Sequence, residues 1–187
     1  MKRDFANGLA YGQMVERRIV ERLVAGGHAV IPTFAAGGVV TAAPVLLAAC
    51  GQKVMPDVLC MGKRVCWVEI KGKSEPGWYR ILQRWEHGID MALIDEYAAV
   101  QGITGKPVWI VVHEECGPVD PARESRLTTG AAQTLCSSLD RLTDIGEHRP
   151  TWPGGKHRPD DRGRDGMGGW LWARADMRRF TVGGRCD

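Results

Sequence analysis

Regularly spaced apolar residues near the start of the chain predict an amphipathic helix from Tyr11 to Ala25. Apolar side chains at positions 14, 15, 19, 20 and 23 fall at helical spacing, and charged residues occupy much of the remaining surface. Gly26 and Gly27 then predict a helix stop, because glycine adopts positive φ angles without steric cost. The residues from His28 to Pro32 are mostly apolar and end at a proline, so we expect a short strand there.

Two runs rich in β-forming residues, Val54 to Met61 and Arg64 to Lys71, predict a pair of adjacent strands. Gly62-Lys63 separates them, and this Gly-X pair is of the kind that closes a two-residue hairpin turn. We therefore expect an antiparallel hairpin in the first half of the chain.

The middle of the chain predicts a further helix and a further strand. Apolar residues at helical spacing run from Ile89 to Gln101, and the continuous apolar run Val108 to Val112 is typical of a strand buried on both faces. Between the hairpin and this helix, Lys73 to Gly88 mixes glycine and proline with aromatic residues, which predicts a loop with some helical content. Residues 34–53 are small and apolar, and their pattern assigns no regular element.

The periodic signal weakens towards the C-terminus, which divides the chain into a core, residues 1–115, and a C-terminal extension, residues 116–187. Within the extension, residues 131–142 predict a short helix and residues 147–169 a mobile basic loop. Residues 168–173 predict an additional strand that packs on the core, followed by a short turn or helix containing Met177 and Phe180.

Composition fits a soluble globular unit with a mildly basic surface. The 187 residues are 44% hydrophobic and 25% charged, and the net charge of +3 permits a nucleic-acid partner without requiring one. Basic residues concentrate between positions 149 and 185, where they either bind phosphates or form a solvated tail. They are Arg149, Lys156, His157, Arg158, Arg162, Arg164, Arg174, Arg178, Arg179 and Arg185.

No stretch of the sequence predicts an export signal or a membrane anchor. The N-terminal residues lack an apolar signal core, and the best apolar stretch, Ala35 to Cys50, is too short and too rich in glycine and proline to span a bilayer. The six cysteines lie far apart without a Cys-x-x-Cys pair, which argues against a structural zinc site. We therefore expect an intracellular, cytoplasmic protein with no membrane partner.

Three ionisable residues of the predicted hairpin have the chemistry of a metal-assisted phosphodiester-cleaving site. Asp57 and Glu69 are carboxylates, the ligands that Mg²⁺ prefers, and the main-chain carbonyl of Ile70 is a further oxygen ligand. Side chains two residues apart in a strand share a face, so Glu69 and Lys71 should point the same way. Lys71 could then orient the attacking water, lower its pKa, or stabilise charge on the phosphate.

This pattern resembles the PD-(D/E)XK nuclease superfamily, written here as Pro56-Asp57 followed by Glu69-Ile70-Lys71. The resemblance extends over roughly residues 11–114, and several segments are similar to small phage-type nucleases, some of them related to Holliday-junction resolvases. It implies a restriction-endonuclease-like α/β fold, a mixed four-stranded sheet flanked by helices in αβββαβ order. The C-terminal extension after Glu115 is where this chain departs from the family, because it carries no family motif.

The resemblance also implies a site residue on the first helix. Many members carry a glutamate there, followed by a leucine seven residues on, a glycine and an apolar strand; this chain has Glu16, Leu23, Gly27 and the run beginning at Ala29. Glu16 is therefore a fourth catalytic candidate and a candidate metal ligand. Glu21 is the competing choice, although it faces elsewhere on the helix.

A second group of residues are candidates for nucleic-acid contact. Lys73 shares the strand face of Lys71, and aromatic faces with a nearby cation are suited to stacking on unpaired bases, although Trp and Lys also serve simply as core and surface residues. Gln101 either reaches the site from the predicted second helix or is an exposed helix-end residue. The full set is Lys73, Trp78, Tyr79, Arg80 and Gln101.

These residues predict a Mg²⁺-dependent nuclease that hydrolyses DNA phosphodiester bonds, with Mn²⁺ as a substitute and an endonuclease acting on structured or duplex DNA as the favoured form. The sequence leaves open whether RNA is also a substrate and whether the protein forms a homodimer. A non-catalytic nucleic-acid-binding or assembly module with a nuclease-like fold is the main alternative, and a metal-free interaction domain is the least favoured.

Overall fold

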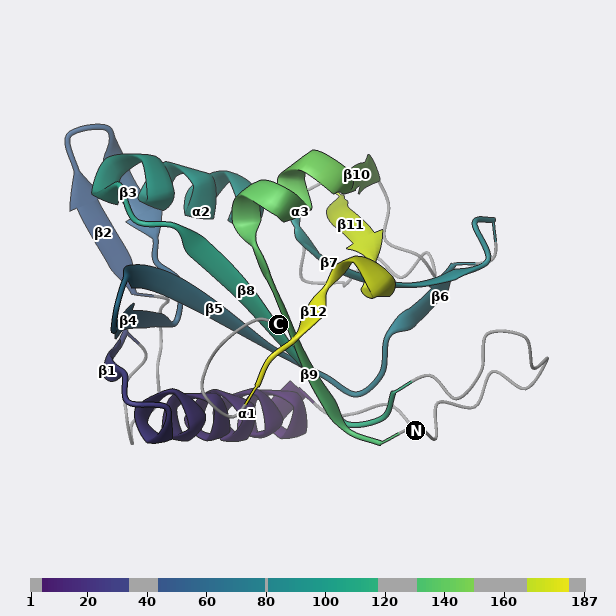
Figure 1. Ribbon diagram of the computed structural model, residues 1–187. Helices are drawn as coiled ribbons and strands as arrows, with labels where there is room; N and C mark the ends of the chain where they lie inside the picture. Colours follow the sequence, from purple (N-terminus) through teal and green to yellow (C-terminus); the bar gives the residue numbers. More distant parts are fainter. Residues whose placement is uncertain (1–4, 34–43, 80, 118–130, 150–167, 182–187) are drawn as a thin grey trace.

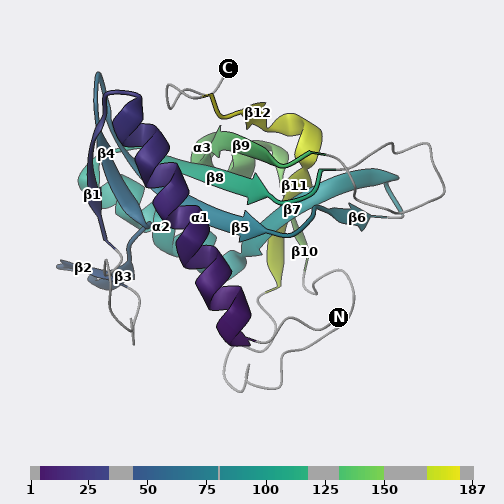
Figure 2. The same cartoon turned by 90° about the horizontal axis from the view of Figure 1, so that it is seen from below.

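Helix α1, Phe5–Ala25, lies along one face of a six-stranded sheet (Figure 1). The computed structural model describes residues 5–33, 44–79, 81–117, 131–149 and 168–181. Seen from below in Figure 2, α1 crosses the strands of this sheet obliquely. The helix ends at Ala25 as predicted, and Gly27 follows with φ +84°, a left-handed conformation that glycine adopts readily.

The main sheet is mixed, with the strand order β1-β4-β5-β8-β9-β12. The strands β5 and β8 are parallel, and the other neighbouring pairs are antiparallel. Because a parallel pair needs a long crossover, the chain leaves the sheet between β5 and β8 and builds the opposite layer there. The strands are β1 (Ala29–Pro32), β4 (Val58–Met61), β5 (Val65–Lys73), β8 (Val108–Glu114), β9 (Gln133–Ser138) and β12 (Arg178–Arg179).

Helices and a second sheet cover the other face of the main sheet (Figure 1). The helices are α2 (Met91–Thr104) and α3 (Leu139–Ile145), and the second sheet has the order β10-β11-β7-β6. Its strands are β6 (Gly77–Tyr79), β7 (Arg84–Asp90), β10 (Glu147–Arg149) and β11 (Gly169–Ala173). A separate hairpin, β2 (Val45–Ala48) with β3 (Gly51–Val54), precedes β4, and the short 3-10 helix η1 (Arg174–Asp176) precedes β12.

Two apolar clusters hold these layers together, one on each face of the main sheet. On the α1 face, Val15, Ile19 and Leu23 pack with Val68 and Ile70 of β5. On the other face, a second cluster joins the main sheet to α2, α3 and β11: Trp67, Ile89, Ile94, Tyr97, Val100, Val108, Ile110, Val112, Leu135, Leu139, Leu142, Trp172 and Met177. β5 is therefore covered on both faces, so any charged side chain in its middle is buried.

The mixed α/β class is confirmed, but the main sheet is larger than the predicted four strands. β9 and β12, from the C-terminal extension, continue it beyond β8, and β11 pairs with β7 in the second sheet. Trp172 of β11 is fully buried in the cluster beneath α2. The C-terminal residues thus contribute directly to both sheets and to the core.

Several predicted elements differ in extent or type. The first helix begins at Phe5, ahead of Tyr11, and the predicted strand 54–61 is interrupted, because Val54 ends β3 while β4 begins at Val58. Met61 is paired with Val65, so three residues close the hairpin where two were predicted. No helix among the described residues is long and apolar enough to cross a membrane.

Two predictions of element type were wrong. Between residues 73 and 88 the chain forms β6 and most of β7 in place of a partly helical loop. The predicted helix 131–142 is strand β9 over residues 133–138 and becomes helix α3 only from Leu139. The strands β7 and β9 carry polar residues at buried positions, among them Glu86, His87 and Thr134, and each of these has a partner far away in the sequence. Their pattern therefore does not show the hydrophobic alternation on which strand prediction depends.

Candidate active site

Asp57 lies at the turn that leads into β4, and its carboxylate is held against β5. The backbone N–H of Ile70 donates a hydrogen bond to Oδ2 of Asp57 over 2.7 Å. Thr33 fixes the turn itself, since its hydroxyl donates to the carbonyl of Pro56 at 2.6 Å and its N–H donates to the carbonyl of Asp57 at 2.8 Å. Hydrogen bonds from Thr33 and from Ile70 thus hold the Pro56-Asp57 dipeptide in place.

Glu69 and Lys71 share one face of β5, as predicted from their spacing, and this face is turned towards α2. Glu69 is only 2% exposed, and its Oε1 forms an ion pair with Nζ of Lys71. Its other oxygen, Oε2, is buried without a hydrogen-bond partner. Because an unsatisfied buried carboxylate oxygen is costly, this atom is suited to a ligand that brings positive charge.

The main-chain carbonyl of Ile70 faces the same side of β5 as the Asp57 carboxylate. The pairing of β4 with β5 ends at Val58 and Val68, so Ile70 extends past the start of β4. The N–H and C=O of one strand residue point to the same side, and the N–H of Ile70 points to Asp57. This arrangement fits the prediction that the carbonyl of Ile70 is a metal-ligand candidate.

Glu16 is half-buried and lies close enough to the hairpin to interact with its charges. Burial is the main cause that raises its pKa, and the negative charge of Glu69 adds to this rise while Lys71 opposes it. Glu21, the competing choice on the same helix, is exposed and lines a different hollow with Arg18 and Arg22. The structure therefore brings Glu16, and not Glu21, to the carboxylates of the hairpin.

Gly72 allows α1 to pass close to β5 beside Lys71. A Cβ atom at this position would stand 2.9 Å from Cε1 of Tyr11 and 3.1 Å from Cγ2 of Val15, closer than ordinary contacts permit. Tyr11 adds a hydrogen bond from its hydroxyl to the carbonyl of Lys73 at 3.2 Å. Because Gly72 has no side chain, the helix that carries Glu16 can pack close to β5.

Burial and neighbouring charges shift the pKa values of both Asp57 and Lys71. The pKa of Asp57 is raised well above its usual range, first by burial and then by the charge of Glu69. Burial pulls the pKa of Lys71 down, but the charges of Glu69 and Asp57 outweigh it and raise that pKa above its ordinary value. Lys71 is therefore a cation at neutral pH.

Two further residues of this site were missed by the sequence analysis. Burial, the charge of Glu69 and a hydrogen bond to Glu69 raise the pKa of Tyr97, a buried residue of α2. Asp90 ends β7, and its charge acts on both Lys71 and Tyr97. Tyr97 falls at core spacing in its helix and Asp90 directly precedes that helix, so the sequence signals of both are those of structural residues.

The predicted nucleic-acid contacts separate into two places. Lys73, Trp78 and Tyr79 line one cavity, and Lys73 belongs to the same strand as Glu69 and Lys71. Gln101 lies elsewhere: its Nε2 donates to Asp140 at 2.6 Å and its Oε1 accepts from the N–H of Val108 at 2.9 Å. Both ends of this amide are used within the protein.

Part of the predicted basic surface lies outside the described residues, namely Arg80, Lys156, His157, Arg158, Arg162, Arg164 and Arg185. Of the four basic residues between positions 149 and 185 that the structure describes, two form ion pairs within the protein. Arg149 forms ion pairs with Glu86 and Glu147, and Arg174 forms one with Glu114. Arg178 and Arg179 are exposed on β12.

The donor atoms fit a hard divalent cation that keeps much of its water. No three His, Cys, Asp or Glu side chains in the described ranges form a ready-made metal-binding group. Mg²⁺ commonly binds proteins through only one or two carboxylates and retains several waters, so it does not need such a group. Oε2 of Glu69 and the raised pKa of Asp57 are the features of this site that a cation would relieve.

Comparison with known proteins shows distant structural similarity. No protein-family model and no curated protein sequence matches this chain. The structure is similar to that of Hjc, a Holliday junction resolvase from the archaeal hyperthermophile Archaeoglobus fulgidus, with a TM-score of 0.47 and 13% identity. The match covers 88% of this chain and 90% of that chain. A similarity this distant assigns neither a family nor an activity.

Proposed function

We propose that this chain is a Mg²⁺-dependent nuclease that hydrolyses DNA phosphodiester bonds, with Mn²⁺ as a substitute and an endonuclease acting on structured or duplex DNA as the favoured form. One observation carries the proposal: Glu69, buried and with one oxygen unpartnered, lies with Asp57 and the cation Lys71 at one point of the sheet. The sequence resemblance to the PD-(D/E)XK superfamily agrees with the same residues.

The metal would be held by Asp57, Glu69 and the carbonyl of Ile70, with Glu16 as a further ligand, directly or through water. When bound, a divalent cation supplies positive charge at the scissile phosphate and makes the attacking water more acidic. The relief of charge repulsion between Asp57, Glu69 and Glu16 supports this set, because burial and mutual repulsion raise the pKa of Asp57 and Glu16 in its absence.

The remaining residues would act on the substrate or position the carboxylates. As a cation with mobile N–H donors, Lys71 can donate a hydrogen bond to the attacking water or to a phosphate oxygen as negative charge develops there. Because its pKa is raised, Lys71 cannot act as a general base near neutral pH. Tyr97 holds Glu69 by a hydrogen bond, so it is a positioning residue.

A cleavage panel tests the proposal. The full-length protein is incubated with Mg²⁺ or Mn²⁺ and with linear duplex, nicked, single-stranded, flapped and four-way branched DNA, and with RNA, while calorimetry measures metal binding. Asp57→Ala and Lys71→Ala should each abolish cleavage while circular dichroism and melting remain those of a folded protein. Lys63→Ala, at an exposed hairpin position, is the matched control and should cut normally. Absence of both cleavage and metal binding would refute the enzyme.

A non-catalytic nucleic-acid-binding module is the second candidate, and one observation favours it. Oε1 of Glu69 is already paired with Lys71, so one candidate ligand oxygen is occupied within the protein. A module of this kind should bind DNA equally well in EDTA and in Mg²⁺, and its melting temperature should not change with Mg²⁺. A metal-binding nuclease should instead be stabilised by Mg²⁺ through mass action.

A further inference from the structure

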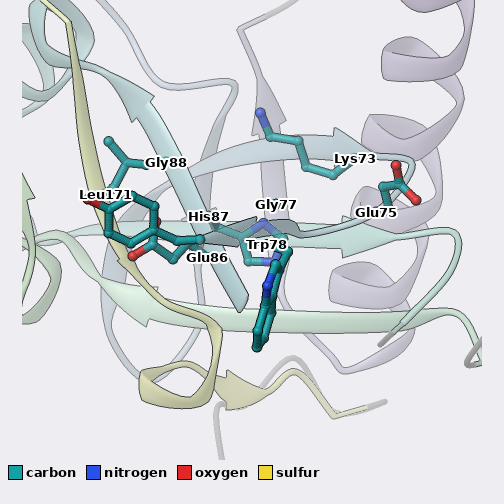
Figure 3. Close-up of a pocket in the computed structure, with 9 residues that line it drawn as sticks. Lys73, Glu75, Gly77, Trp78, Glu86, His87, Gly88 and Leu171 are labelled. Atoms are coloured by element: carbon teal, nitrogen blue, oxygen red, sulfur yellow. The ribbon is translucent and has the colours of Figure 1, made fainter. Parts of the chain in front are cut away.

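A cavity of about 160 Å³ lies between the end of β5 and the second sheet (Figure 3). Its walls include Lys73 at the end of β5, Trp78 and Tyr79 of β6, and Glu86 and His87 of β7. Lys73 is two residues beyond Lys71 on the same strand face, so their Cα atoms are about 6.6 Å apart. The cavity therefore begins two residues after Lys71 of the proposed cleavage site.

The volume of the cavity suits a single planar group such as one nucleobase. An engineered cavity of about 150 Å³ in another protein accepts benzene, whereas pockets for drug-sized molecules measure roughly 300 Å³ or more. Trp78 and Tyr79 offer aromatic faces, and Lys73 and Glu75 add a charge of each sign to the rim. Aromatic faces beside polar edge groups are the features that recognise an unpaired nucleobase.

Buried ion pairs hold one wall of the cavity. The guanidinium of Arg149 lies 3.5 Å from the centre of the Tyr79 ring and donates two hydrogen bonds of 2.7 Å to Glu86. Trp78 in turn packs edge-on against Trp85, with ring centroids 5.1 Å apart. These contacts fix the aromatic side chains before any ligand arrives, which lowers the entropy cost of binding.

The opposite part of the wall is held by a second buried network. Nε2 of His87 lies 2.6 Å from Oε1 of Glu114, and Arg174 donates to both oxygens of Glu114 at 2.7 and 2.8 Å. Burial lowers the pKa of His87, so its imidazole is neutral at pH 7 and donates its Nε2 proton to the Glu114 carboxylate. The other ring nitrogen then carries a lone pair that can accept a hydrogen bond from a base N–H.

From this arrangement we propose that the cavity lined by Lys73, Trp78 and His87 is a subsite for one unpaired nucleobase of the nucleotide that flanks the scissile phosphate. Lys73 contacts the phosphate of that nucleotide, Trp78 stacks on its base, and His87 meets the edge of the base. The inference rests on the proposed nuclease function, and it specifies the substrate: a strand whose base at the cut is unpaired, because a base inside a duplex stack cannot enter.

Binding in EDTA tests this subsite separately from cleavage. The full-length protein is titrated into a single-stranded pentanucleotide with 2-aminopurine at its centre and thymine elsewhere, and quenching of the 2-aminopurine fluorescence is measured. We expect saturable quenching, weakened about tenfold by Trp78→Ala and largely retained in Trp78→Phe, since base–aromatic stacking carries the affinity. A pentanucleotide with an abasic centre should compete about tenfold more weakly than its thymine counterpart.

Lysine variants give an independent test that does not alter the aromatic residues. Lys73→Ala should weaken binding and reduce its salt dependence, while Lys63→Ala should change neither. Equal affinity of the Trp78→Ala variant and the parent, or of the abasic and intact pentanucleotides, would overturn the subsite. If the parent still cuts DNA in that case, the nuclease proposal stands; if binding depends on Trp78 but no DNA is cut, the subsite stands and the nuclease proposal falls.

Discussion

The backbone N–H of Ile70 donates a 2.7 Å hydrogen bond to the carboxylate of Asp57, so the turn before β4 is tied to the middle of β5. This bond places Asp57 beside the residue that separates Glu69 from Lys71. This hydrogen bond also offsets part of the pKa rise that burial causes at Asp57, because a hydrogen bond to the charged form of a carboxyl group lowers its pKa. Burial and the charge of Glu69 nevertheless prevail, and the pKa of Asp57 is raised overall.

The first prediction concerns the pH dependence of stability in EDTA. A carboxyl whose pKa is raised by folding contributes stability that is present below its unfolded value, near 3.8, and is lost as the pH rises through the folded value. Asp57→Asn removes this loss, so its stability advantage over the parent should grow from about pH 4 upwards. Urea unfolding from pH 4 to 8 measures the free energy of unfolding of both proteins, and in thermal melting each kcal/mol corresponds to roughly 2–4 °C in Tm.

Addition of Mg²⁺ provides the control for this experiment. The cation should stabilise the parent at pH 8 and have little effect on Asp57→Asn, because the variant lacks one of its two principal carboxylate ligands. A stability difference that stays constant from pH 4 to pH 8 would contradict the assigned burial of the Asp57 charge.

The second prediction separates the two glutamates of α1. Glu16→Gln should lower the cleavage rate by about tenfold to a hundredfold, because Glu16 is close to the charges of Glu69 and Lys71 and would help to hold the metal. Glu21→Gln removes the same charge from an exposed position of the same helix and should leave the rate unchanged. Rates measured over a range of Mg²⁺ concentrations check this; equal rates for both variants would remove α1 from the site.

The third prediction assigns Tyr97 a positioning role. Tyr97→Phe keeps the buried ring but deletes the hydroxyl that bonds to Glu69, and we expect about a tenfold higher Mg²⁺ concentration for half-maximal cleavage. A purely structural role would change the melting temperature but not this Mg²⁺ dependence. Titration of the cleavage rate with Mg²⁺, together with thermal melting, distinguishes the two.

The fourth prediction concerns the contribution of the C-terminal residues to stability. Arg174→Met leaves Glu114, which is fully buried, without its two hydrogen bonds from Arg174, so the free energy of unfolding should fall by about 3–5 kcal/mol. Lys53→Met breaks the Lys53–Glu96 pair near the surface and should cost at most about 1 kcal/mol. Chemical unfolding at pH 7 measures both variants; similar losses for the two would contradict a buried network.

Much of the candidate site was predictable because it depends on local rules. The period of two in a strand places Glu69 and Lys71 on one face, and the helical spacing of Val15, Ile19 and Leu23 predicts the buried side of α1. Each of these patterns involves residues close together in the sequence, so a single chain segment carries the whole signal. The choice of Glu16 over Glu21 came from the family resemblance, and its proximity to Glu69 in the fold agrees with it.

Only the tertiary structure decided which polar residues are buried and what they meet. His87 and Glu114 are 27 residues apart, and Glu114 and Arg174 are 60 apart, so no local pattern indicates that they form one network. The same applies to β7 and β9, whose buried polar residues hide the strand alternation and led to the wrong element types. The sequence by itself determined the chemistry of Asp57, Glu69 and Lys71, while long-range pairing decided the cavity beside them.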